Sequence, residues 1–423
     1  MIAALLALAV TMAQPPERPA DCTHLCGGEA LAPVARTLHD PERQRPLRIL
    51  ILGDSHSAAD HISGALRERL QGRYGEGGRG VLPAGLAFQG YSIRQGAIEA
   101  SGVRMTRTGD DGQAAGLSGF VATAQAGARL SLAVEGVAAF DELTICYLAE
   151  PGAGVLSITA GDARLEQSAA ASDRAPRCVT LTPSSRAFEA AVEVSGAPVR
   201  LFSWAARRTT GGGVEVSNLG VIGALATSVL NRDAALLQAE LEAYRPDLII
   251  VAFGTNEGFE PQLDLDAYHA AYAGVLTRLA SLAPQAQVVA LGAPDAATVR
   301  PDLYYDGRDE AFAVCSPLTP VERADYAALV AARDPALARW YAPPMLGPVR
   351  EAQRDVARSQ GVPFWDWEAA MGGPCSIHQF YLADPPMARG DHVHFTRWGA
   401  DLIGGRLADD LIAAFEAARE GSD

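Results

Sequence analysis

Lysine is missing from this 423-residue sequence, so all 35 of its basic residues are arginine. Schiff-base chemistry and a Walker phosphate-binding loop both require a lysine amine, and both are excluded. Positive charge is also scarce, because 35 basic and 50 acidic side chains give a formal net charge of −15. A surface of that sign repels a phosphate backbone, which argues against nucleic acid as a partner.

A transmembrane helix is also lacking, because no stretch is both long and apolar enough to form one. The apolar run at residues 2–10 instead suits the central region of a signal peptide, although the usual basic residues before it are absent. We expect a signal peptide over residues 1–13 and an N-terminal extension over residues 14–44. The protein is then periplasmic or otherwise exported, with no integral membrane span. A retained apolar helix is the alternative.

Cysteine is sparse, at six residues, and the spacings match no zinc-binding pattern. An even number of cysteines in an exported chain favours disulfides, and buried free thiols are the alternative. The simplest pairing joins neighbours along the chain: Cys22 with Cys26, Cys146 with Cys178, and Cys315 with Cys375.

Most of the chain alternates between two patterns. Short apolar runs typical of buried strands occur at residues 47–52, 248–253, 287–291 and 362–365. Helical spacing occurs at residues 58–71, 224–244, 266–282, 349–359 and 398–418. Alternating strands and helices predict βαβ crossovers, and therefore an α/β fold with a doubly wound, mostly parallel sheet.

The pattern changes between residues 103 and 208, where short alternating runs are separated by turn residues. The expected strands are residues 128–134, 142–148, 155–160, 177–181, 190–194 and 199–205. Even spacing of this kind predicts an inserted β-sandwich or jelly-roll domain. The α/β domain would then comprise residues 45–102 and 209–423, with the triple glycine at 211–213 as a linker.

Three polar motifs stand beside these elements and together predict a serine-hydrolase centre. They are Gly-Asp-Ser-His at residues 53–56, Gly-Thr-Asn-Glu at residues 254–257 and Asp-His-Val-His at residues 391–394. Ser55 would be the nucleophile at the C-terminal edge of the sheet. His394 would be its base, and Asp391 would orient that imidazole.

Other interpretations of these residues remain open. Asp54 and Ser55 also suit a helix cap, and Asp391 suits an ordinary loop. His392 and His394 could form a metal-binding pair, although nearby partner ligands are lacking. Otherwise His392 is expected to be exposed or packed rather than catalytic.

The oxyanion formed in acyl transfer needs donors that are already in place. The candidates are the side chain of Asn256, the backbone N–H of Gly223 and the backbone N–H of Ser55. Taken singly, Asn256 is more typical of a turn, and Gly223 of a loop or a helix start. The order of the blocks along the chain favours the catalytic interpretation.

The chain resembles the SGNH, or GDSL-type, hydrolase superfamily, whose fold is flavodoxin-like. The residues that carry this resemblance are Ser55, Gly223, Asn256 and His394. The β insert and the glycine-rich segment at residues 75–80 are similar to those of bacterial peptidoglycan O-acetylesterases. In these enzymes the insert resembles a carbohydrate-binding domain. The resemblance implies an acyl-enzyme mechanism that removes acetyl groups from the C6 hydroxyl of N-acetylmuramic acid, with an O-acetylated glycan as substrate and no cofactor or metal.

Two positions depart from that subfamily. The residues between Gly220 and Gly223 are Val and Ile, where the subfamily tends to have Asn, so Gly220 is an alternative source of the oxyanion amide. His392 stands where the subfamily often has glycine. These departures leave other functions open: an acetyl esterase or O-acetyltransferase acting on another glycan, a lipid-acting thioesterase or lysophospholipase, or a non-catalytic glycan-binding protein on a hydrolase scaffold.

Overall fold

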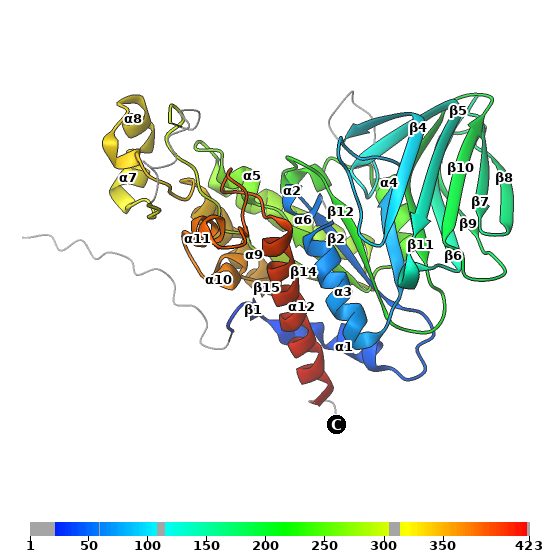
Figure 1. The fold of residues 1–423 in the computed structure, drawn as a ribbon, viewed down its shortest axis with the longest axis horizontal. Coiled ribbons are helices and arrows are strands. Elements are labelled where there is room, and N and C mark those ends of the chain that lie inside the picture. Colours follow the sequence, from blue (N-terminus) through cyan, green and yellow to red (C-terminus); the bar gives the residue numbers. More distant parts are fainter. Residues whose placement is uncertain (1–21, 59, 108–114, 304–313, 421–423) are drawn as a thin grey trace, which may run out of the picture.

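The computed structural model describes residues 22–58, 60–107, 115–303 and 314–420. It contains two sheets, a parallel one flanked by helices and a larger antiparallel one beside it (Figure 1). The predicted signal peptide, residues 1–13, lies outside the described residues. Within them, no helix combines the length and the apolar character needed to cross a membrane.

The first sheet confirms the predicted doubly wound α/β fold. Its strand order is β1-β15-β14-β13-β2-β12, and all neighbours are parallel except β1 and β15. The strands are β1 (Leu25–Cys26), β2 (Leu47–Gly53), β12 (Val214–Gly220), β13 (Leu248–Ala252), β14 (Gln287–Leu291) and β15 (Phe364–Trp365). Beginning at β12, the parallel strands follow the flavodoxin-like order, in which the first strand of the chain lies between the second and the third.

Helices cover both faces of this sheet because its strands are apolar on both sides. Leu50 and Leu52 face one apolar cluster, and Ile49 and Ile51 face the other. The first face carries α4 (Ala234–Tyr244), α6 (Leu265–Leu282) and α9 (Leu346–Ser359). The second carries α1 (Ala32–His39), α3 (Ile62–Tyr74) and α12 (Arg397–Glu420). The shorter helices are α2 (Ser55–Ala58), α5 (Thr255–Gly258), α7 (Pro320–Ala324), α8 (Tyr326–Ala331), α10 (Trp367–Met371) and α11 (Ser376–Leu382).

Two helices differ from their predicted ranges. The helix predicted at residues 58–71 is divided, because α2 forms a separate turn and α3 begins at Ile62. The helix predicted at residues 224–244 begins only at Ala234. There the Asp233 side chain accepts a hydrogen bond from the Leu236 N–H and so caps the helix.

The antiparallel sheet surrounds its own apolar cluster. Its strands are β3 (Gly78–Pro83), β4 (Gly96–Arg107), β5 (Phe120–Val134), β6 (Glu142–Ala149), β7 (Val155–Ala160), β8 (Ala163–Ser168), β9 (Ala175–Leu181), β10 (Glu189–Ser195) and β11 (Val199–Arg207). The strand order is β8-β7-β10-β5-β11-β6-β9, with β3 beside β11 and β4 beside β5. The sheet is continuous and nearly closed, so the predicted sandwich of two separate sheets is not confirmed.

The long strand β5 explains this continuity. Its beginning pairs with β11 and its end pairs with β10. The hydrogen-bond ladder therefore continues through this one strand instead of ending between two sheets, as it would in a sandwich. The sheet also begins at Gly78 rather than near residue 103, because β3 and β4 belong to it. These strands were not predicted because β3 is rich in glycine and β4 alternates mainly between half-buried and exposed residues.

The predicted disulfide pairing is confirmed. Cys22 bonds to Cys26, Cys146 to Cys178 and Cys315 to Cys375. The second disulfide joins the neighbouring strands β6 and β9. Free buried thiols, the alternative interpretation, are therefore wrong.

A buried ionic cluster joins the two sheets beside α3. Asp60 accepts hydrogen bonds from Arg67 on α3, at 2.9 Å, and from Arg79 on β3, at 2.7 Å. Although burial alone raises the pKa of Asp60, these two arginines hold it well below its usual range. Asp60 is fully buried, so both guanidinium groups depend on this one carboxylate for neutralisation.

We expect Asp60→Ala to lower the free energy of unfolding by about 3–5 kcal/mol, because it leaves two buried arginines without a counter-charge. Urea denaturation measures this change. The control is Asp409→Ala, which removes an ion pair with Arg69 in which both side chains are more than half exposed, and which should cost about 1 kcal/mol or less. Equal losses in the two variants would contradict this account.

Candidate active site

Three adjacent strands of the parallel sheet end at the same level. Gly53 at the end of β2 is paired in register with Gly220 of β12 on one side and with Ala252 of β13 on the other. Ser55, Gly223 and Asn256 follow these three strand ends within four residues. The chain connects β2 to β12 on one side, whereas it connects β13 to β14 on the other side. The edge beside β2 and β13 is therefore the topological switch point, where doubly wound folds bind ligands.

Glycine is required at Gly53 by the close approach of the backbone. A Cβ atom there would lie 2.4 Å from the Ser57 Oγ and 2.7 Å from the Ala252 carbonyl oxygen. Without one, the chain turns directly from β2 into α2 and places Ser55, partly exposed, at the sheet edge. Among the described residues, the Ser55 N–H has no hydrogen-bond acceptor.

The predicted contact between Ser55 and His394 is present. The His394 Nε2 lies 2.9 Å from the Ser55 Oγ, although 339 positions separate the two residues along the chain. On the other side of the ring, Nδ1 lies 2.8 Å from the Asp391 Oδ2. A carboxylate only accepts, so Nδ1 carries a proton and Nε2 is left to accept the serine proton.

Asp391 also shapes the loop that carries His394. Its Oδ1 accepts hydrogen bonds from the backbone N–H groups of Val393 and His394, each at 2.9 Å. Burial raises the pKa of Asp391, but the bonds from His394 and Val393 outweigh it and hold that pKa well below its usual range. Asp391 is therefore ionised at neutral pH, as an orienting carboxylate must be.

His56 connects the serine loop to the histidine loop and had no predicted role. Its Nε2 donates to the Val393 carbonyl oxygen at 2.9 Å, and its Nδ1 lies 3.2 Å from the Asp54 Oδ1. Burial lowers the pKa of His56, but the hydrogen bond to Asp54 reverses the shift and the net change is upward. The ring is also stacked on that of His394, with centroids 5.5 Å apart. The Gly-Asp-Ser-His motif contained these residues, but its pattern did not show what they would contact.

The proposed oxyanion donors come from three segments, and one of them, Asn256, is hydrogen-bonded to the loop that carries Gly223. Gly223 is exposed, has a φ of +71° and, within the described residues, has no acceptor for its N–H. The Gly220 N–H instead donates to the Asn218 Oδ1 at 3.1 Å. That bond occupies Gly220 and favours Gly223 as the amide donor. The Asn256 Nδ2 donates to the Ala224 carbonyl oxygen at 3.0 Å and retains a second N–H.

Glu257 is hydrogen-bonded to the same loop, the one that carries Gly223. Its Oε1 accepts a hydrogen bond from the Ala226 N–H at 2.7 Å. Its Oε2 is buried without a hydrogen-bond partner among the described residues. Burial raises the pKa of Glu257 to about 7. Asn256 and Glu257 thus attach the loop that carries Gly223 to α5.

The alternative of a metal-binding pair finds no support in the contacts of the two histidines. His394 faces Ser55 through one ring nitrogen and Asp391 through the other. His392 is buried and directs its Nε2 at the His378 Nδ1, at 3.0 Å. Throughout the described parts of the chain, no group of three or more His, Cys, Asp or Glu side chains is arranged to hold a metal ion.

Comparisons with known proteins agree with this geometry. The profile of the GDSL-like lipase/acylhydrolase family matches residues 190–402. This range includes Gly223, Asn256 and His394, whereas Ser55 lies before it. A solved peptidoglycan O-acetylesterase is similar over 93% of this chain and 99% of its own, with 21% identity and a TM-score of 0.72. That likeness shows a shared fold. A search of curated proteins gave no match.

Two other solved structures are more distant. A GDSL-like lipase from Parabacteroides merdae is 15% identical, over 47% of this chain and 74% of its own, with a TM-score of 0.31. A family two carbohydrate esterase from Clostridium thermocellum is 11% identical, over 73% of this chain and 98% of its own, with a TM-score of 0.28.

We expect Glu257→Gln to stabilise the protein at pH 8, by roughly 2–3 kcal/mol, and to have little effect at pH 4.5. The folded-state pKa of about 7 lies above 4.5, the ordinary pKa of a glutamate, so between these pH values the folded chain retains a proton that the unfolded chain has released. The wild type therefore loses stability as pH rises through this window, and a glutamine does not titrate. Urea denaturation across pH 4.5–8 tests this. Exposed Glu260, replaced by glutamine, is the control, and a stability difference independent of pH would contradict the expectation.

Proposed function

Since the chain belongs to the GDSL-like lipase/acylhydrolase family and is a serine esterase, we propose that it removes O-acetyl groups from a cell-wall glycan. Peptidoglycan is the proposed substrate, at the C6 hydroxyl of N-acetylmuramic acid. The observation that carries the proposal is the hydrogen-bonded chain from Ser55 through His394 to Asp391, beside the loop that carries the Gly223 N–H. The fold shared with a peptidoglycan O-acetylesterase supports the choice of substrate.

In the proposed mechanism His394 accepts the proton of Ser55 as its Oγ attacks the ester carbonyl. The oxyanion is stabilised by the N–H groups of Ser55 and Gly223 and by the side chain of Asn256. The sugar hydroxyl then leaves with the proton from His394, which leaves an acetyl group on the serine. Water repeats the sequence and releases acetate. Asp391 keeps the imidazole in the required tautomer and stabilises its charged form. No step requires a cofactor.

We further propose that the antiparallel sheet binds the glycan. Its outer face forms a groove of about 990 Å³ across β4, β5, β10, β7 and β8. Polar side chains line it, among them Glu99, Arg129, Ser131, Thr159 and Arg164. Hydroxyl, carboxylate and guanidinium groups match the hydroxyl groups of a sugar chain as donors and acceptors.

We also propose that the protein acts outside the cytoplasm, in the periplasm or beyond. The apolar run at residues 2–10 motivates this proposal, and three disulfides support it, because such bonds persist in oxidising compartments. Detection of the mature protein in a periplasmic fraction, cleaved after Ala13, is the corresponding measurement.

We expect Ser55→Ala to lower kcat for acetate release from O-acetylated peptidoglycan by about 10³-fold or more, because the nucleophile is lost. Ser281→Ala, on the exposed side of α6, is the matched control and should keep wild-type activity. Acetylated xylan, assayed in parallel, distinguishes peptidoglycan from other glycans. Wild-type activity in Ser55→Ala would contradict the mechanism, and an inactive wild type would favour the non-catalytic glycan-binding alternative.

A preference for short acyl groups separates this proposal from a lipid-acting esterase. We expect kcat/KM for p-nitrophenyl acetate to exceed that for the octanoate ester by about tenfold or more, since an acetyl-sized pocket rejects longer chains. Comparison of the acetate, butyrate and octanoate esters gives the answer. A rate that rises with chain length would instead support a thioesterase or lysophospholipase.

A further inference from the structure

His392 lies between Asp391 and His394 but touches no reacting atom in the mechanism proposed above. Its backbone has a φ of +53°, in the left-handed region that glycine adopts without strain and other residues adopt at a cost. Its side chain is nevertheless buried, with 2% of its surface exposed. A strained, buried histidine directly beside the proposed catalytic residues requires contacts that compensate for its conformation.

Those contacts hold the ring on its face and at both nitrogens. Trp340 stacks on it, with ring centroids 3.6 Å apart and planes inclined by 18°. The His392 Nδ1 lies 3.1 Å from the Gly390 carbonyl oxygen, and its Nε2 lies 3.0 Å from the His378 Nδ1. A carbonyl only accepts, so Nδ1 carries the proton and Nε2 accepts from His378. Burial lowers the pKa of His392 to about 4, which keeps the ring in this neutral form.

The backbone of His392 is held as firmly as its ring. Its N–H donates to the Arg389 carbonyl oxygen at 3.0 Å, and its carbonyl oxygen accepts from the Ala297 N–H at 2.8 Å. The direction in which the chain leaves His392 decides where the next two residues lie, and the second of them is His394. A shift at His392 would therefore move the His394 imidazole away from Ser55.

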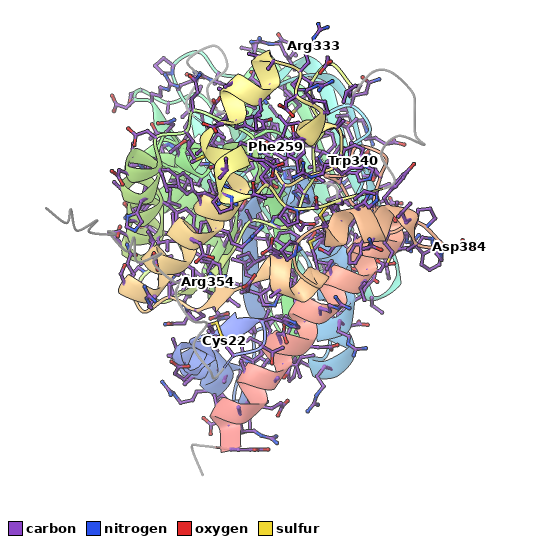
Figure 2. All side chains as sticks on the ribbon, turned by 90° about the vertical axis from the view of Figure 1, so that its left-hand side faces the viewer. Cys22, Phe259, Arg333, Trp340, Arg354 and Asp384 are labelled. Carbon is purple, nitrogen blue, oxygen red and sulfur yellow. A yellow bond between two sulfur atoms is a disulfide. The ribbon has the colours of Figure 1, made fainter. Side chains whose placement is uncertain are left out.

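The two ring partners of His392 come from segments that a disulfide joins. Trp340 is paired with the segment around Cys315, since its N–H donates to the Val314 carbonyl oxygen at 3.1 Å. Cys375, the other half of the disulfide, directly precedes α11, which carries His378. Figure 2 shows Trp340 on the face of the molecule that also carries α7 and α8, the yellow helices at the top of the view.

We propose that His392 is a positioning residue for His394, and that the Cys315–Cys375 disulfide keeps its partners Trp340 and His378 in place. The inference rests on the proposed esterase function and adds a structural requirement to it. The catalytic loop then depends on a segment that supplies no catalytic group. If His392 affected only its own backbone, replacing it with glycine would relieve the strain and would not lower kcat.

His392→Gly tests the proposal with p-nitrophenyl acetate as substrate. We expect kcat to fall about tenfold or more, with KM within about twofold of wild type, because the acyl group still binds while the base is misplaced. Circular dichroism establishes that the assayed variant is folded. A folded His392→Gly variant with wild-type kcat would overturn the proposal.

Trp340 provides a second test that does not alter the strained residue. Trp340→Phe retains an aromatic face for His392 and should keep kcat within about threefold of wild type, whereas Trp340→Leu should lower it about tenfold. Equal activity in the phenylalanine and leucine variants would overturn the proposal even if His392→Gly does not fold.

The disulfide is tested with the double variant Cys315→Ser/Cys375→Ser. We expect its kcat to fall by a similar factor, while Cys146→Ser/Cys178→Ser, which removes the disulfide of the antiparallel sheet, keeps wild-type kcat. Equal losses in both double variants would show a general effect of disulfide loss and overturn the role of Cys315–Cys375. Comparison with Ser55→Ala separates the two hypotheses. A wild type no more active than Ser55→Ala would refute the esterase function. An active wild type with an equally active His392→Gly would refute this inference alone.

Discussion

The hydrogen bond between the His394 imidazole and the Ser55 hydroxyl joins the turn that follows β2 to the loop before the last helix. All that folds between them must bring these two groups within 2.9 Å. The sheet does this by placing β2 between β12 and β13, so that the residues that follow these two strands lie on either side of the serine. α12, packed on α3, begins just after the loop that carries His394 and runs from this edge toward the C-terminus at the other end of the sheet (Figure 1).

The contacts around this bond form two supports. On the serine side, His56 joins the Gly-Asp-Ser-His turn to the Val393 carbonyl oxygen, so the two catalytic loops are bonded to each other as well as through the reacting atoms. On the other side, Trp340 and His378 hold His392 against the disulfide-linked segment. A catalytic hydrogen bond needs both ends fixed to within a fraction of an ångström, and no single loop of this chain provides that.

The antiparallel sheet is closely joined to the α/β part. Asp60 bonds to arginines from α3 and from β3, and Ser217 of β12 accepts a hydrogen bond from the Val81 N–H of β3 at 2.9 Å. The apolar cluster beneath β2 and β13 continues into Phe120 and Ala205 of the antiparallel sheet. The two sheets therefore share one packed interface, through β3, β5 and β11.

Much of the parallel sheet was predictable because its strands are short apolar runs between amphipathic helices, and these patterns are local. β12 was missed, since Glu215, Ser217 and Asn218 interrupt its apolar character although the strand is buried throughout. Those polar groups are accommodated by partners from distant segments: Asn218, for example, donates to the Ser57 carbonyl oxygen, and Ser217 accepts from the Val81 N–H. The closure of the antiparallel sheet was missed for a related reason, because one strand pairs with two others that follow it much later in the chain.

The sequence indicated the periodicity of the strands and helices and the order of the motifs around Ser55, Gly223, Asn256 and His394, and it favoured disulfides between neighbouring cysteines as the simplest pairing. Each of these depends on residue type and spacing along the chain. Three features became visible from tertiary contacts alone. Among the described residues, the Gly223 amide has no acceptor whereas that of Gly220 has one, His56 bridges the two loops, and His392 stacks on Trp340 and bonds to His378. These facts depend on which distant groups meet, and burial makes such contacts strong without leaving a periodic pattern in the sequence.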